Sequence, residues 1–84
     1  MAEVIWNKQA EQEWRKCLLY GYAEFGQTTA IQFVQRTNYI IGIISKHPKV
    51  GSPEPLLRKK GKFYRFFHLV GSLKLIYYYV ESSN

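Results

Sequence analysis

Residues 62–80, which read KFYRFFHLV, then GS, then LKLIYYYV, decide the fold. The two outer stretches are rich in aromatic and β-branched residues, and Gly71-Ser72 between them suits a two-residue hairpin turn. Alternation along the first stretch places Arg65 on one face of the strand and His68 on the other. The sequence therefore predicts an antiparallel hairpin in the second half of the chain.

Two amphipathic helices precede this hairpin. Apolar residues recur on one helical face from about Lys8 to Tyr22, with Asn7 as a suitable N-cap, and again from about Thr28 to Lys46. Pro48 ends the second helix, and the short break at Gly26 predicts an antiparallel helical hairpin. The side chains expected to be buried are Trp14, Leu18, Phe33, Val34, Ile40, Ile41 and Ile44.

The remaining segments complete the expected topology. Glu3 to Trp6 is predicted to form a short strand, and Lys49 to Lys60, which contains Gly51, Pro53 and Pro55, is predicted to be a surface loop. The order is then strand, helix, helix, strand, strand. This predicts a single α+β domain over residues 1–84, with an antiparallel sheet packed against an N-terminal helical hairpin.

Composition limits the classes of protein that fit. The chain has 84 residues, is 46% hydrophobic, and carries one cysteine, Cys17, which excludes an internal disulfide and fits a reducing cytosol. No signal peptide is recognisable, and no apolar run approaches the roughly 20 residues of a membrane span. We expect a cytoplasmic protein without a membrane partner. His47 and His68 lack metal-ligand spacing with Cys17, so neither a metal nor a cofactor is expected.

The positive charge is concentrated in the second half. Residues 1–47 hold five basic and four acidic side chains, whereas residues 48–84 hold seven basic and two acidic ones. Such a field attracts nucleic acid or an acidic protein partner. The run Arg58-Lys59-Lys60-Gly61-Lys62 fits either a phosphate-binding segment or a solvated loop.

Several short motifs, in this order, resemble the RelE/ParE toxin superfamily. They are Val4-Ile5-Trp6-Asn7 before Ala10, Phe25-Gly26 with Ala30 and Phe33, His47-Pro48-Lys49-Val50-Gly51, Tyr64-Arg65, and Leu75-Ile76-Tyr77. The resemblance covers residues 4–80, nearly the whole chain.

The resemblance implies the toxin of a bacterial type II toxin–antitoxin system of the plasmid-stabilisation type. Such a toxin is bound and neutralised by a cognate antitoxin and acts on translation or on DNA gyrase. Two alternatives stay open. One is a ribosome-dependent, metal-independent mRNA endonuclease of the RelE type, and the other is a degenerate, non-toxic family member that still binds an antitoxin.

The resemblance also suggests site residues. RelE-like enzymes use a cluster of lysine and arginine, and alignment on the family places Arg65 and Lys74 at two such positions, while Phe67 stands where RelE itself is basic. A full catalytic set is therefore not expected. Arg65 fits equally a strand-end arginine that lies along the core, and Tyr77, Tyr78 and Tyr79 fit packing or base stacking. A single positive surface for nucleic acid or the antitoxin is expected to comprise Arg58, Lys59, Lys60, Lys62, Arg65 and Lys74.

The end of the chain also differs from the family pattern. The pattern continues into a last strand, whereas this chain stops at Glu81-Ser82-Ser83-Asn84. We therefore expect a C-terminally incomplete fold whose open sheet edge promotes homo-oligomers or strand addition by the antitoxin.

Overall fold

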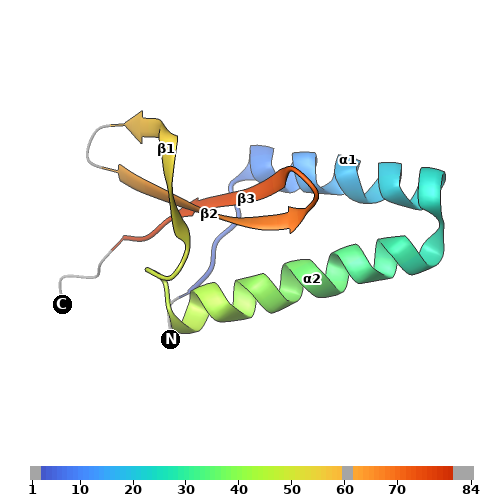
Figure 1. The fold of residues 1–84 in the computed structure, drawn as a ribbon, viewed down its shortest axis with the longest axis horizontal. Helices are drawn as coiled ribbons and strands as arrows, with labels where there is room; N and C mark the ends of the chain where they lie inside the picture. Colours follow the sequence, from blue (N-terminus) through green and yellow to red (C-terminus); the bar gives the residue numbers. More distant parts are fainter. Residues whose placement is uncertain (1–2, 60–61, 81–84) are drawn as a thin grey trace.

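A computed structural model describes residues 3–59 and 62–80 of the chain. Two helices, α1 (Lys8–Phe25) and α2 (Gln27–Lys46), are followed by three strands, β1 (Ser52–Lys59), β2 (Lys62–Val70) and β3 (Leu73–Tyr78). The strands form one antiparallel sheet in the order β1-β2-β3 (Figure 1). The α+β class, with an N-terminal helical hairpin and an antiparallel sheet, is confirmed.

Local signals set the ends of the helices. The Oδ1 atom of Asn7 accepts hydrogen bonds from the amides of Gln9 and Ala10, at 2.8 and 3.2 Å, and so caps α1 as predicted. Gly26 ends α1 and begins α2, and its φ of 93° is a conformation that side-chain-bearing residues rarely adopt. A single residue therefore turns the chain from one helix into the other.

The prediction of an opening strand was wrong. The predicted loop from Lys49 to Lys60 is a loop only as far as Gly51, because Ser52–Lys59 form strand β1, and Lys60 lies outside the described residues. Residues 3–7 form no strand, and the ring of Trp6 instead packs edge-to-face on Trp14 at 6.0 Å. The third strand of the sheet is β1, which pairs with β2. Pro53 lacks an amide hydrogen but is tolerated in β1, because β1 is an edge strand and its pairing is irregular between Pro53 and Arg58.

The core lies between α2 and the sheet. Ile40, Ile44 and Leu69 are buried there, and partly buried side chains pack around them: Trp14, Phe33, Phe67, Leu73, Leu75 and Tyr77. Of the seven side chains predicted to be buried, Ile40 and Ile44 are buried and the other five are half-buried. The predicted inner stripes of both helices thus face the core, but the sheet and the other helix bury these side chains only in part.

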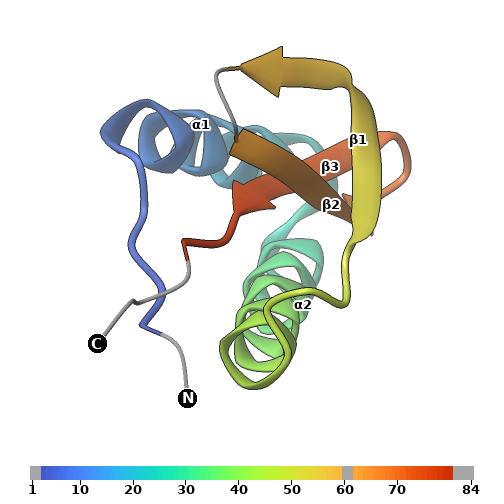
Figure 2. The same ribbon diagram turned by 90° about the vertical axis from the view of Figure 1, so that its left-hand side faces the viewer.

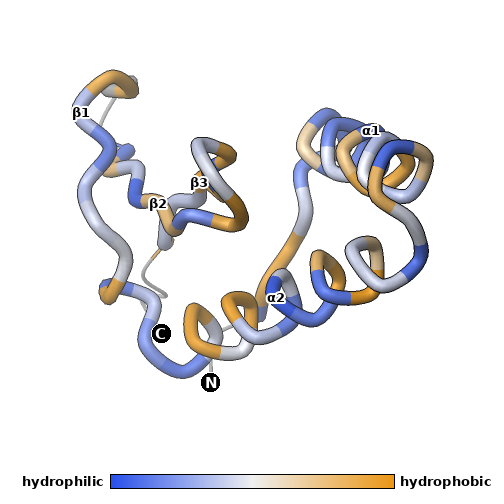
Figure 3. Tube along the Cα trace, turned by 45° about the vertical axis from the view of Figure 1, so that its right-hand side comes forward, coloured by the Kyte–Doolittle hydropathy of each residue, from blue (hydrophilic) through white to orange (hydrophobic). Residues whose placement is uncertain are grey.

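The incomplete cover follows from the arrangement of the elements. Figure 2 shows the strands over α2 with α1 beside them, and Figure 3 shows α1 well apart from the sheet. No residue of α1 is fully buried. The helical hairpin also extends past the strands (Figure 1), so the sheet does not cover its tip, where Tyr22 is 57% and Phe25 68% exposed. No helix in the described part of the chain has the length and apolarity needed to cross a bilayer.

Candidate functional site

The register of the hairpin separates the two residues predicted to be catalytic. Arg65 lies opposite Tyr77, whereas Lys74 lies opposite His68. Because side chains alternate along a strand, Arg65 belongs to the face of the sheet that packs on α2, which we call the inner face. Lys74 belongs to the opposite, outer face. The predicted single positive surface is therefore wrong for this pair, since the sheet lies between them.

Arg65 is held by a contact at the start of β1. Its Nη1 donates to the carbonyl of Gly51 at 2.9 Å, and its guanidinium lies 4.7 Å from the centre of the Phe63 ring. The Tyr77 hydroxyl accepts from the Gly51 amide at 2.9 Å and donates to the Pro48 carbonyl at 2.8 Å. These bonds form a clasp that joins the segment after α2 to β2 and β3. The structure thus assigns Arg65 a structural role, because its guanidinium holds the start of β1 through Gly51.

Lys74 is paired with a buried carboxylate. Its Nζ lies 3.1 Å from Oε1 of Glu54, whose residue is only 5% exposed, and 4.3 Å from the centre of the Phe66 ring. The other carboxylate oxygen of Glu54 accepts from the Leu56 amide at 3.2 Å. The hydrogen bond from Lys74 and then that from the Leu56 amide lower the pKa of Glu54, against the opposing effect of burial.

The outer face is mainly aromatic. Tyr64 packs edge-to-face on Tyr78 at 5.4 Å between ring centres, and Phe66 packs in the same manner on His68 at 5.3 Å. Tyr78 is 42% exposed, and Lys62 Nζ lies 4.7 Å from the centre of its ring. These outer-face side chains are Lys62, Tyr64, Phe66, His68, Lys74, Ile76 and Tyr78, and with Glu54 they form what we call the aromatic face. The assignment of Arg65 and His68 to opposite faces by alternation is confirmed.

Of the other cations predicted for the positive surface, the structure gives backbone positions for some and not for Lys60. Arg58 and Lys59 belong to β1, where they are the register partners of Phe63 and Lys62. Lys60 lies outside the described residues. Backbone register therefore pairs Lys59 with Lys62 at the end of the β1-β2 hairpin.

A second surface feature is an open groove of about 450 Å³ between the helices. Its lining is largely apolar, and a pair between Glu11 and Arg15 (3.7 Å) lies at its rim. Trp14 is fixed beside it, since its Nε1 donates to Thr37 Oγ1 at 2.9 Å and that hydroxyl donates to the Phe33 carbonyl at 2.9 Å. The groove is lined by Trp6, Glu11, Trp14, Arg15, Leu18, Leu19, Thr37, Asn38 and Ile41.

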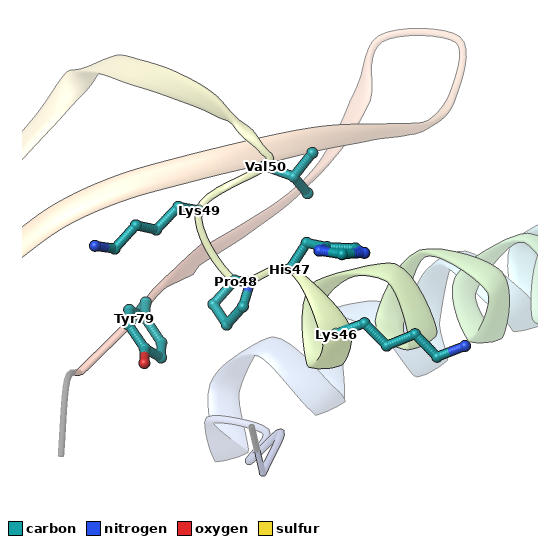
Figure 4. Close-up of a pocket in the computed structure, with 6 residues that line it drawn as sticks. All are labelled: Lys46, His47, Pro48, Lys49, Val50 and Tyr79. Carbon is teal, nitrogen blue, oxygen red and sulfur yellow. The ribbon is translucent and has the colours of Figure 1, made fainter. Parts of the chain in front are cut away.

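A third feature, at the end of α2, does not assemble a site. It is a shallow depression lined by Lys46, His47, Pro48, Lys49, Val50 and Tyr79. Figure 4 shows Lys46 and Lys49 pointing to opposite sides of it, so their amines do not converge on one anion. We assign it no function.

Among the residues of these surfaces that sequence reasoning missed are Glu54 and Leu19. Glu54 carried a weak signal, because it is one of only two acidic residues in the basic second half. Leu19, which is 68% exposed and lines the groove, gave no signal, because it lies outside the predicted inner stripe of its helix. Comparison of the chain with protein-family models, with curated proteins and with solved structures finds no match. The resemblance to RelE/ParE toxins therefore stays a prediction from the chain's own residues.

Proposed function

We propose that this chain is the toxin of a bacterial type II toxin–antitoxin pair of the RelE/ParE kind, neutralised in the cytoplasm by a cognate antitoxin. Two features support the proposal. A helical hairpin followed by an antiparallel sheet agrees with the expectation from the sequence motifs. The net charge of +6 suits an acidic partner.

The observation that carries the proposal is the small buried core and the large exposed surface of the chain. Among the described residues, the buried hydrophobic side chains are only Ala30, Ile40, Ile44 and Leu69. The chain exposes 6840 Å², whereas a compact monomer of 9.9 kDa exposes about 5,200 Å². Its radius of gyration is 13.8 Å, compared with about 12 Å for a compact domain of this length. A partner that covers roughly 800 Å², as in a standard interface, accounts for half of this excess area.

The groove defines the chemistry of that partner. Trp6, Leu18 and Ile41 offer apolar contacts, so the partner needs an apolar stripe. The net charge of +6 favours a partner that also carries acidic residues. An amphipathic, acidic antitoxin segment meets both requirements and is the occupant that we propose.

The placement of the cations favours a toxin that acts by binding over one that cuts mRNA. Metal-free cleavage of RNA requires cationic groups that converge on one phosphate. Arg65 and Lys74 lie on opposite faces of the sheet, and each is already engaged, with Gly51 and Glu54 respectively. We therefore propose binding to the translation apparatus or to DNA gyrase as the mode of action.

Inducible expression, alone and with the product of the adjacent gene, tests the proposal. We expect growth arrest by the chain alone and rescue by the second protein, with supercoiling and mRNA integrity assayed separately. Leu19→Glu in the groove should weaken rescue and complex formation. Ile31→Glu is the matched control, because Ile31 is also an exposed apolar residue of the hairpin but does not line the groove.

Each outcome separates the alternatives. Arrest with mRNA cleavage restores the RelE-type nuclease, and complex formation without arrest identifies a degenerate member. Neither arrest nor a complex overturns the proposal.

A further inference from the structure

We propose that the aromatic face binds single-stranded nucleic acid, with unpaired bases stacked on Tyr64, Phe66 and Tyr78. This inference goes beyond neutralisation by an antitoxin, because it concerns the side of the sheet that faces away from α2. The helical groove lies elsewhere, so an occupant of one surface does not need to displace the occupant of the other.

The arrangement of the rings carries the proposal. Tyr78 is 42% exposed, and Tyr64 and Phe66 are half-buried beside it. Clusters of apolar side chains that reach solvent mark binding sites. The Tyr64–Tyr78 and Phe66–His68 pairs are edge-to-face, with interplanar angles of 74° and 81°, so neither pair covers both rings as a parallel stack does. The faces of the Tyr78 and Phe66 rings each carry a lysine amine, from Lys62 and Lys74 respectively. A base also presents a flat π surface and stacks on such a ring in place of the amine.

The spacing favours an unpaired strand over a duplex. Alternate residues of β2 on one face, such as Tyr64 and Phe66, are about 6.8 Å apart along the strand. Stacked nucleotides rise by about 3.4 Å, so bases must separate from one another to reach successive rings. A single strand can separate its bases freely, whereas a duplex must first unpair.

The lysines of this face supply positive charge for the phosphates of a bound strand. Lys62 Nζ lies 4.7 Å from the Tyr78 ring and Lys74 Nζ lies 4.3 Å from the Phe66 ring. A base that stacks on either ring takes the place of the amine, and the flexible lysine then pairs with the adjoining phosphate.

Glu54 limits this charge. Its carboxylate holds Lys74 at 3.1 Å and is the one acidic group on the aromatic face among the described residues. Removing the carboxylate releases the Lys74 amine toward a phosphate. The contact with Glu54 thus sets the affinity of the face for an anionic strand.

Fluorescence anisotropy with the purified full chain tests the proposal. The probes are a labelled uridine 12-mer, a thymidine 12-mer and a duplex of the same length, with inorganic polyphosphate as an aromatic-free competitor. We expect at least one single-stranded probe to bind more tightly than the duplex and to resist polyphosphate. The first two probes distinguish RNA from DNA as the source of the bases.

Variants identify the surface. Tyr78→Ala should weaken binding by about fivefold or more, as loss of one stacked base predicts, while Tyr78→Phe should retain it. Tyr22→Ala is the matched control on α1. Glu54→Gln should tighten binding more than Glu11→Gln, which removes the same charge from an exposed position on α1. Lys74→Gln should abolish that gain.

The contrary results are equally specific. Equal binding by the wild type and Tyr78→Ala, equal affinity for duplex and single strand, displacement by polyphosphate alone, or no binding to any probe each overturns the proposal. If Tyr78→Ala fails to fold, the opposite effects expected of Glu54→Gln and Lys74→Gln still test the surface. No antitoxin enters this assay, so its outcome does not depend on the proposed toxin function.

Discussion

Lys74 on β3 and Glu54 on β1 meet across the whole width of the sheet, with 3.1 Å between Nζ and Oε1. The ring of Phe66 on the central strand lies beneath the lysine amine, 4.3 Å away. The pair therefore ties the two edge strands together, although they are not neighbours in the sheet. Its loss should loosen β1, the strand whose pairing is already irregular.

The first prediction concerns pH. The pKa of Glu54 is lowered below its ordinary value of 4.5 by the Lys74 hydrogen bond, so the folded chain favours the charged carboxylate more than the unfolded chain does. This contribution is present above the ordinary pKa and is lost as the pH falls through the lowered one. Urea unfolding from about pH 7 to about pH 3 should show this loss of stability, reduced in Glu54→Gln. Glu11→Gln removes an exposed helical pair and should keep the wild-type slope.

The second prediction compares two glycines. A Cβ atom at Gly51 would lie 2.6 Å from the Tyr77 hydroxyl oxygen, whereas one at Gly42, within α2, meets nothing within 4 Å. Gly51→Ala should therefore destabilise the fold by roughly 1–3 kcal/mol through displacement of Tyr77. Gly42→Ala should stabilise it by about 0.5–1 kcal/mol through helix propensity. Urea titration of both variants checks the opposite signs, and equal effects would contradict the clasp.

The third prediction addresses the same clasp from its other side. Tyr77→Phe keeps the ring stacked on Phe67 but removes the hydroxyl that bonds to Gly51 and Pro48. The expected cost is roughly 1–3 kcal/mol, because the Gly51 amide is left without its partner. Tyr39→Phe is a suitable control, since Tyr39 is 62% exposed on α2. A Tyr77→Phe variant as stable as that control would show that the hydroxyl is dispensable.

The elements that were predicted correctly depend on neighbours in the sequence. Gly71-Ser72 marks the hairpin turn, and Asn7 and Pro48 mark helix ends, each within a few residues of the effect. β1 was missed because Pro53 and Pro55 resemble a loop, and only pairing with β2 makes the segment a strand. Glu3 to Trp6 has strand composition but finds no strand partner in the described structure.

The candidate site shows the same limit. Sequence identified Arg65 and Lys74 as notable cations, but the hairpin register places them on opposite faces. Glu54 could not be matched with Lys74, because twenty residues separate them in the chain and an intervening strand separates them in space. Long-range register, which local pattern does not encode, therefore determined which cations share a surface.

The fourth prediction concerns the helical hairpin. Thr37 is 2% exposed, and its hydroxyl accepts from the Trp14 indole while it donates to the Phe33 carbonyl. Thr37→Val preserves the shape but leaves the indole N–H without this acceptor, at an expected cost of roughly 1–3 kcal/mol. Because this bond joins α1 to α2, Trp14 fluorescence should also shift toward that of a more exposed indole. Thr28→Val, at an exposed position near the start of α2, should leave both stability and fluorescence unchanged.

The last prediction concerns self-association. β3 pairs with β2 alone, so the backbone groups on its other side have no strand partner among the described residues. Ile76, on this edge strand, is 42% exposed. An open edge with apolar side chains invites a further strand, and a lysine placed on it opposes pairing. Light scattering should therefore show the mass of the isolated chain rising with concentration, and Ile76→Lys should suppress the rise.

The control for this self-association test is Ile31→Lys, which adds the same charge at an exposed helical position. Equal suppression by both variants would assign the effect to net charge, and a constant monomer mass at high concentration would show that the β3 edge does not recruit a second copy.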